Sequence, residues 1–151
     1  MTPMERSRRA FGADRILSAV ERIVGEQMRL ALEPSGLELE EWRVLDLLSD
    51  GDGHTMAETA EFALLPPPTL TKVVNRLVAN NLVHRRTGTV DRRQVLIRNT
   101  ERGRQKFLDV AESVEAVHSR VFGSDSDREL FETVLRSTMS NALSEQVAAD
   151  H

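Results

Sequence analysis

Cationic side chains are concentrated in one part of this chain, where their chemistry suits binding to phosphate groups. Between Pro66 and Lys106 the sequence holds ten Lys or Arg residues and two acids, a net charge of +8. The remaining residues include 10 basic and 22 acidic ones, so the whole chain carries −4. Because a polyanion needs a local positive surface, this asymmetry indicates a nucleic-acid-binding segment.

The residue patterns of common catalytic sites are missing from the sequence. Its four histidines (His54, His84, His118 and His151) lack the spacing of a metal site, and there is no Gly-rich phosphate loop or Gly-x-Ser-x-Gly motif. The chain has no cysteine, which excludes disulfides and thiolate zinc sites. We therefore expect no enzyme, no metal and no cofactor. No apolar run approaches the roughly 20 residues that span a bilayer, so we expect a cytoplasmic protein without a membrane partner.

Two short helices and a hairpin are expected to position the cations. Thr55 and Glu58 have the spacing of a capping box, which opens the first helix. The next should begin near Pro67 or Pro68, because proline is tolerated in a first turn. We expect apolar faces on these helices, at Ala57, Ala60, Phe62 and Leu64 and at Leu70, Val73, Val74 and Leu77. An arginine-rich strand–turn–strand follows from Val83 to Ile97.

Long amphipathic helices flank this segment, the first from about residue 13 to 32. Two further apolar stripes lie near the C-terminus, at Phe107, Val110, Val114, Val117 and Val121 and at Phe131, Val134, Leu135, Met139, Leu143 and Val147. A single chain would leave much of these stripes exposed, so we expect a homodimer in which the terminal helices of two copies pack together. The alternative is that these helices fold back on their own domain.

The order and spacing of the motifs resemble those of the MarR (multiple antibiotic resistance regulator) family. The resemblance rests on Glu41–Leu45 (EWRVL), Thr69–Leu77 (TLTKVVNRL) and Leu82–Arg86 (LVHRR). The family's wing pattern is matched by Asp91, Arg93, Thr100 and Gly103, whereas Asn99 stands where leucine is usual, from which we expect a slightly altered exit from the wing strand.

The resemblance implies a mainly α fold with a small β-hairpin wing, namely a winged helix-turn-helix with N- and C-terminal dimerisation helices. We expect a single domain, residues 1–151. The DNA-binding region would span about 37–103 and the dimerisation helices about 13–34 and 104–148. The implied function is a transcriptional regulator of double-stranded DNA, a repressor that binds a near-palindromic operator as a homodimer. The alternative is a winged-helix module that binds a protein instead of DNA.

In such a protein the helix that follows the prolines enters the major groove. Hydroxyl, amide and ammonium groups there can hydrogen-bond base edges, and methylene or methyl groups can contact thymine methyls. We expect Arg76 to contact phosphate or to form an internal salt bridge. The candidate recognition-helix residues are Pro67, Pro68, Thr69, Thr71, Lys72, Asn75 and Arg76.

The wing is expected to place an arginine in the flanking minor groove, where a narrow A·T-rich groove attracts the cation. Arg93 is the first candidate, with Asp91 orienting its guanidinium, and Arg92 is the alternative. Three other arginines suit phosphate contacts or pairs within the hairpin equally well, namely Arg85, Arg86 and Arg98.

The family resemblance also implies a small aromatic or phenolic ligand between dimer arm and reading head. Met28, Leu32, Trp42 and His54 are the candidate residues of that cleft. For Trp42, a place in the hydrophobic core is the competing interpretation.

Overall fold

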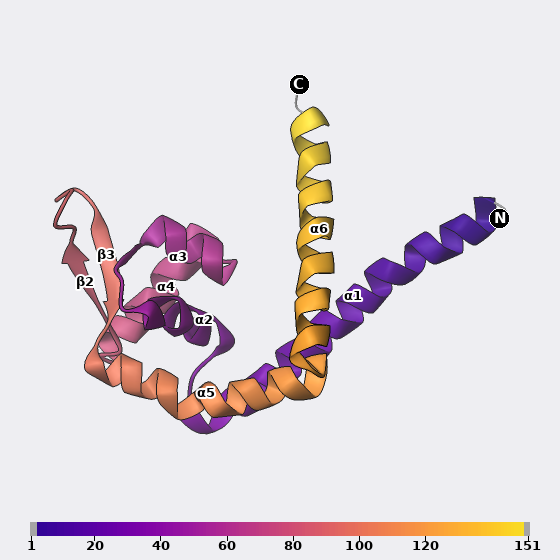
Figure 1. Ribbon diagram of the computed structural model, residues 1–151. Coiled ribbons are helices and arrows are strands. Elements are labelled where there is room, and N and C mark those ends of the chain that lie inside the picture. Colours follow the sequence, from indigo (N-terminus) through magenta and orange to yellow (C-terminus); the bar gives the residue numbers. More distant parts are fainter. Residues whose placement is uncertain (1–2, 150–151) are drawn as a thin grey trace. The chain divides into compact units, whose positions relative to one another are not determined.

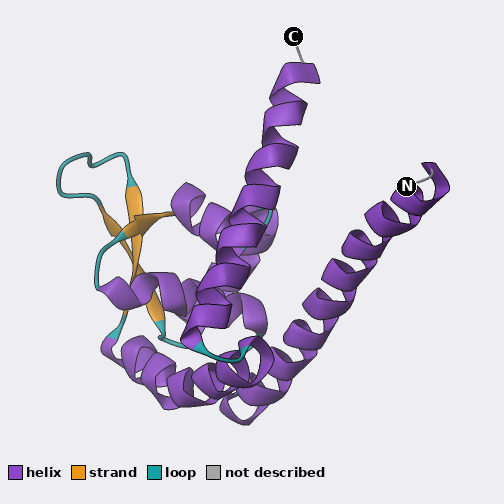
Figure 2. Cartoon of the chain, turned by 45° about the vertical axis from the view of Figure 1, so that its right-hand side comes forward, coloured by secondary structure: helices purple, strands orange, loops and turns teal. Residues whose placement is uncertain are grey.

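The computed structural model describes the backbone of residues 3–149 and the side-chain exposure of residues 12–144. It is mainly helical, with a small antiparallel sheet, as the sequence predicts (Figures 1 and 2). In chain order the elements are α1 (Pro3–Leu32), the 3-10 turn η1 (Glu33–Ser35), α2 (Leu39–Leu47), the 3-10 turn η2 (Leu48–Asp50), β1 (His54–Thr55), α3 (Met56–Ala63), α4 (Pro67–Ala79), β2 (Val83–Thr87), β3 (Val95–Asn99), α5 (Glu101–Phe122) and α6 (Asp125–Ala149).

The chain divides into two compact units, and the boundary lies between Val114 and Glu115 inside α5. The first unit holds the sheet, helices α1 to α4 and the beginning of α5. The second holds the rest of α5 and α6. Across the described residues, no helix combines the length and the apolar character needed to cross a membrane.

Helix α4 begins at Pro67, as its proline-rich start predicts. The missing N–H of Pro67 costs nothing in the first turn, where it would have no helical acceptor. The expected stripe is confirmed, since Leu70, Val73, Val74 and Leu77 are all buried. The helix ends at Ala79 with Asn80 as its C-cap, and Asn81 then takes a left-handed backbone conformation with φ of 57°. One face of α4 is thus fixed in the core and the other is left to solvent.

Helix α3 begins with the expected capping box. The Glu58 amide donates to Thr55 Oγ1 at 3.2 Å, and the Thr55 amide donates to the Glu58 carboxylate at 2.9 Å. The apolar face predicted for α3 is wrong in part, because Ala60 is buried but Ala57, Phe62 and Leu64 are exposed. The helix also buries Thr59 and Ala63. Leu64 lies past the last turn with φ of 57°, so it no longer follows the helical periodicity.

The sheet contains one strand more than the expected hairpin. Its order is β1–β3–β2, all antiparallel. The added strand pairs His54 with Ile97 and Thr55 with Leu96. Strand β2 pairs with β3 from Val83 opposite Asn99 to Thr87 opposite Val95. A two-residue strand carries almost no periodic signal, which explains why the sequence did not reveal β1.

The junction between β3 and α5 is tightly packed. Thr100 Oγ1 donates to the Asn81 carbonyl at 2.7 Å and accepts the Gly103 amide at 2.9 Å. A Cβ at Gly103 would lie 1.9 Å from the Leu82 carbonyl oxygen, so only glycine fits. Asn99 remains paired in β3, and its side-chain amide donates to the Leu45 carbonyl at 3.3 Å.

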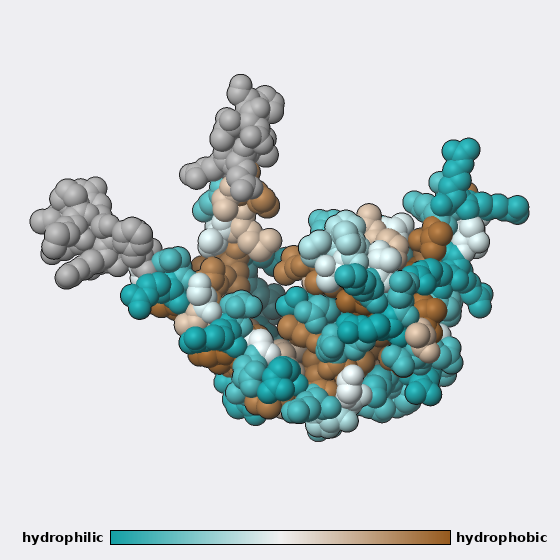
Figure 3. Space-filling view, turned by 180° about the vertical axis from the view of Figure 1, so that it is seen from behind, coloured by the Kyte–Doolittle hydropathy of each residue, from teal (hydrophilic) through white to brown (hydrophobic). Residues whose placement is uncertain are grey.

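The flanking helices differ in exposure, and this corrects one expectation. Val110, Val114 and Val117 on α5 are buried within the single chain, so they are not the exposed stripe on which the dimer was argued. Helix α6 does expose its apolar residues, which Figure 3 shows as brown patches. These are Leu130, Val134, Met139 and Leu143, whereas the side chain of Val147 lies outside the described residues. Helix α1 likewise exposes Ile16, Leu17, Ile23 and Leu30.

Candidate nucleic-acid interface

The solvent-facing side of α4 carries every recognition-helix residue that the sequence singled out. Pro67, Pro68, Thr69, Thr71, Lys72, Asn75 and Arg76 are all exposed. The Thr71 hydroxyl donates to the Pro67 carbonyl at 3.0 Å. Its proton is therefore engaged within the helix, and what it offers outward is a methyl group and an acceptor oxygen. Thr69 and Lys72 stand beside it as donors.

The last two of these residues already have partners in the protein. Arg85 Nη2 on β2 donates to Asn75 Oδ1 at 2.5 Å, so the amide oxygen expected to contact a base instead joins α4 to the wing. Arg76 forms an ion pair with Glu38 at 2.6 Å and lies 3.5 Å from Glu41. The hydrogen bond with Glu38 raises the pKa of Arg76. Of the two roles expected for Arg76, the structure shows the internal salt bridge.

The wing loop is held by its own backbone. The Gly88 amide donates to the Gln94 carbonyl at 2.8 Å, and the Gln94 amide donates to the Asp91 carbonyl at 3.1 Å. Arg92 and Arg93 at the tip are exposed. The wing projects at the upper right of Figure 3, where its surface is mostly hydrophilic, although Val90 in its loop is exposed. Arg92 and Arg93 thus lie in the loop at the tip of the hairpin, and neither guanidinium forms a salt bridge within the part of the chain that the structure describes.

Asp91 acts on Arg93 differently from the expectation. Its carboxylate accepts the backbone amide of Arg93 at 2.9 Å, and no salt bridge to the Arg93 guanidinium occurs among the described residues. An aspartate two residues before an amide readily closes such a turn, which satisfies the carboxylate locally. Asp91 therefore holds the backbone at the wing tip and does not orient the guanidinium.

The arginines of the hairpin strands lie on opposite faces of the sheet. Arg85 faces α4, where it binds Asn75. Arg98 Nη1 donates to the carbonyl of Gly51, in the turn after η2, at 3.0 Å. Arg86 is exposed on the same face as Arg98. Two of the three arginines thus have partners outside the hairpin, which neither expected role included.

Comparison with known proteins identifies this architecture. The profile of the MarR family matches residues 35–94, from the turn after α1 to the wing tip. The chain is 31% identical to CouR from Rhodococcus jostii RHA1, whose structure was solved with p-coumaroyl-CoA bound. The alignment covers 82% of this chain and 88% of CouR, with a TM-score of 0.74. The chain belongs to the MarR family.

Two other proteins are similar to this chain over most of their length. AbsC, a MarR family transcriptional regulator from Streptomyces coelicolor, is 25% identical, with a TM-score of 0.78 over 95% of this chain and 97% of AbsC. The uncharacterized HTH-type transcriptional regulator YwoH of Bacillus subtilis is 27% identical over 117 residues, which are 76% of this chain and 85% of YwoH. This MarR-family protein is accordingly a helix-turn-helix transcriptional regulator.

Three of the four residues expected to border a ligand cleft lie in the core of the described structure. Met28, Leu32 and Trp42 are buried, and the Trp42 ring stacks on Phe107 with centroids 4.7 Å apart. The competing interpretation of Trp42 as a core residue is the one that the structure supports. The fourth residue, His54, has a partner of its own, because its Nε2 lies 2.7 Å from the Asp50 carboxylate.

Sequence reasoning missed the acids that anchor α4. Glu38 and Glu41 form a capping box at the start of α2, where the Glu38 amide donates to the Glu41 carboxylate at 3.0 Å. Glu41 is buried, and both acids also contact Arg76. The three-residue spacing of two glutamates before an apolar run was the available signal. These acids couple the start of α2 to the recognition helix.

Proposed function

We propose that this MarR-family regulator is a homodimeric repressor that binds a near-palindromic operator in double-stranded DNA. In this proposal α4 enters the major groove and the wing reaches the adjacent minor groove. The observation that supports it is that the recognition-helix residues of α4 are exposed, as are Arg92 and Arg93 at the tip of the wing. Both groups belong to a segment of net charge +8. Such a surface suits DNA better than the alternative, a protein partner, because its cations are unpaired at the points of furthest reach.

The roles of the individual residues follow from their surroundings. We assign base contacts to Thr69, Thr71 and Lys72, with Pro67 and Pro68 against thymine methyl groups. We assign the minor groove to Arg93, with Arg92 as the alternative, and phosphate contacts to Arg85, Arg86 and Arg98. Asn75 and Arg76 position α4, since both are bonded within the protein.

Exposed apolar side chains support the homodimer. Burial of such residues is favourable by about 25 cal/mol per Å² of apolar surface, and a second copy supplies the same surface by two-fold symmetry. The candidates are Ile16, Ile23 and Leu30 on α1, which recur every seven residues, and Leu130, Val134, Met139 and Leu143 on α6. The interface is therefore assigned to α1 and α6 instead of the buried seam of α5.

Selection of bound duplexes from a random pool tests the proposal. Two heads on a two-fold axis should select inverted half-sites whose centres lie about 34–36 Å apart. Lys72→Ala should relax the selected half-site, whereas Lys106→Ala, outside the interface, should leave it unchanged. Selection of duplexes without inverted symmetry would contradict DNA binding by two DNA-binding regions related by a two-fold axis. Binding to no duplex at low salt would favour the protein-binding alternative. A reporter downstream of the selected site should be expressed more strongly when the regulator is absent.

We further propose that a small aromatic ligand weakens operator binding. The support is CouR, solved with p-coumaroyl-CoA. In this chain a ligand at Met28, Leu32 and Trp42 would have to separate the stacked rings of Trp42 and Phe107. Titration with p-coumaroyl-CoA should therefore quench or shift the fluorescence of Trp42, the only tryptophan, as the operator is released. Unchanged fluorescence and unchanged operator affinity would refute this site for that ligand class.

A further inference from the structure

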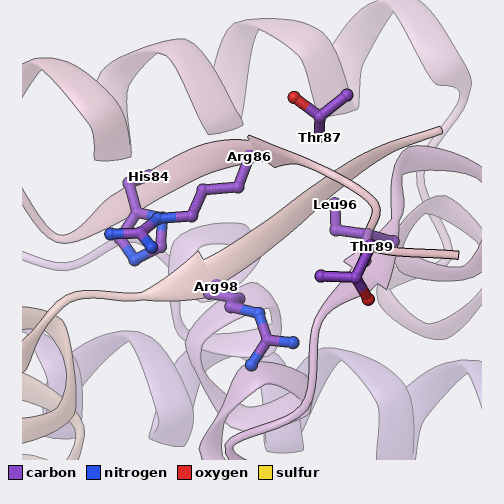
Figure 4. A pocket seen from close by; sticks show the side chains of 6 residues that line it. All are labelled: His84, Arg86, Thr87, Thr89, Leu96 and Arg98. Carbon is purple, nitrogen blue, oxygen red and sulfur yellow. The ribbon is translucent and has the colours of Figure 1, made fainter. Parts of the chain in front are cut away.

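The outer face of the wing, defined by His84, Arg86, Leu96 and Arg98, gathers three nitrogen-bearing side chains around one hollow. The strand register pairs His84 with Arg98 and Arg86 with Leu96. Because successive side chains of a strand alternate between its two faces, all four project from the same side of the hairpin. Figure 4 shows His84 and Arg86 on β2, Arg98 and Leu96 on β3, and Thr87 on the other side of the ribbon. With Thr89 from the wing loop, these residues line a cavity of about 300 Å³.

The two guanidinium groups of this face form no salt bridge among the described residues. Arg86 and Arg98 are diagonal neighbours across the strands, which places their Cβ atoms roughly 7–8 Å apart. No salt bridge joins either arginine to a carboxylate among the described residues, although the charge of Arg98 does act on Asp50. Arg98 is held in place by its bond to the Gly51 carbonyl. Two neighbouring cations with one nearby acid leave an excess of positive charge, which favours a shared anion.

The histidine adds a third, independent observation. Nδ1 of His84 is buried and has no hydrogen-bond partner in the described structure. Buried polar atoms are nearly always paired, and an exception commonly marks the place of an absent ion or ligand atom. An oxygen atom of an anion between Arg86 and Arg98 is a partner that an N–H group of the imidazole can bind.

We propose that the outer wing face is a binding site for one small oxyanion, a phosphate or carboxylate group. Guanidinium groups bind both groups in a bidentate manner, and a cavity of this size has room for one such group together with several water molecules. The group comes either from a phosphodiester of bound DNA or from a free small molecule. The site lies on the side of the sheet opposite Arg85 and α4, so it is separate from the base-reading surface. It does not depend on the proposed repressor function, since DNA-free protein suffices to detect it.

The test is a titration of the full chain with inorganic phosphate at constant ionic strength, followed through the NMR resonances of the His84 ring. Wild-type protein should show saturable binding, and Arg86→Gln should weaken it at least tenfold. Arg86 is exposed, so its loss leaves the fold intact, which thermal unfolding verifies. Arg92→Gln removes an equal charge from the wing tip and should bind phosphate as wild type does. A titration without saturation, or equal affinity in Arg86→Gln and wild type, would overturn the site.

Repeating the titration on the DNA complex distinguishes the two sources of the anion. If the site holds a DNA phosphodiester, the complex should no longer bind inorganic phosphate, and Arg86→Gln should reduce the log–log salt slope of DNA binding by about one. If the site serves a free anion, the complex should still bind phosphate and the slope should be unchanged. If the protein binds phosphate but binds no DNA, the anion site is supported and the repressor proposal is contradicted.

Discussion

The apolar face of α6 offers the sharpest test of how this protein assembles. Val134 is 54% exposed in the single chain, in the middle of a face that also exposes Leu130, Met139 and Leu143. We predict that Val134→Glu separates the dimer while each chain stays folded. The reason is that about half of the Val134 side chain is exposed in its own chain and would be buried only against the second copy.

The size of the effect follows from the exposed fraction. Full burial of a valine stabilises by about 1.5–3 kcal/mol, so the half still exposed is worth about 0.8–1.6 kcal/mol per copy. A symmetric dimer contains the substitution twice, which gives about 1.6–3.2 kcal/mol, and burial of a carboxylate adds to this cost. At about 1.4 kcal/mol per factor of ten, the dissociation constant should rise between about 10-fold and 200-fold.

Sedimentation equilibrium measures the dimer, and urea unfolding monitors the fold of the chain. Ser140→Glu is the control, because Ser140 is exposed and lies six residues after Val134, about 120° around the helix from it. The control should remain dimeric. Val114→Glu should behave differently from both, since Val114 is buried in its own chain and a charge there unfolds it. Native dimerisation of Val134→Glu would show that the interface does not include this face of α6.

Three further predictions concern the wing, the β3–α5 junction and the cap of α3. Arg93→Ala should weaken operator binding, lower the log–log salt slope by about one and reduce the preference for A·T flanks. If only Arg92→Ala causes these three changes, Arg92 is the residue in the minor groove. If neither substitution causes them, the hairpin is not a DNA-binding wing. Gly103→Ala should markedly lower the melting temperature, because the added Cβ would meet the Leu82 carbonyl. The control Gly25→Ala has open space and should raise the melting temperature slightly, since alanine is favoured over glycine in a helix by about 1 kcal/mol. Equal melting temperatures of the two variants would refute the packing argument. The Thr55 amide lowers the pKa of Glu58, so its contribution to stability is present above the ordinary carboxyl pKa and is lost as pH falls through the lowered value. Glu58→Gln should therefore reduce the loss of stability in urea titrations below about pH 4.5, and an unchanged pH profile would contradict this.

Local patterns in the sequence predicted those parts of the fold that local forces determine. Thr55 and Glu58 are three residues apart and cap α3 as expected. The stripe of α4 is buried as its spacing indicates, and Pro67 begins the helix. In each case the deciding interactions lie within one or two helical turns, where sequence spacing is spatial spacing.

Features that depend on distant residues could not be predicted in the same way. The burial of Val114 depends on which elements cover α5, and a heptad spacing does not specify whether its partner is the same chain or another. The bond between Asn75 and Arg85 depends on how close β2 comes to α4. His84 Nδ1 and its neighbours become a candidate site only once the strand register is known.

The bond between Asn75 and Arg85 also bears on how far the specificity of this regulator can be redesigned. It joins the element proposed for the major groove to the element proposed for the minor groove through a single pair of side chains. A new residue at position 75, chosen for a different base, would release Arg85 and with it one restraint on the wing. The core and the flanks of an operator are therefore not independent design variables in this protein, and positions 75 and 85 have to be varied together.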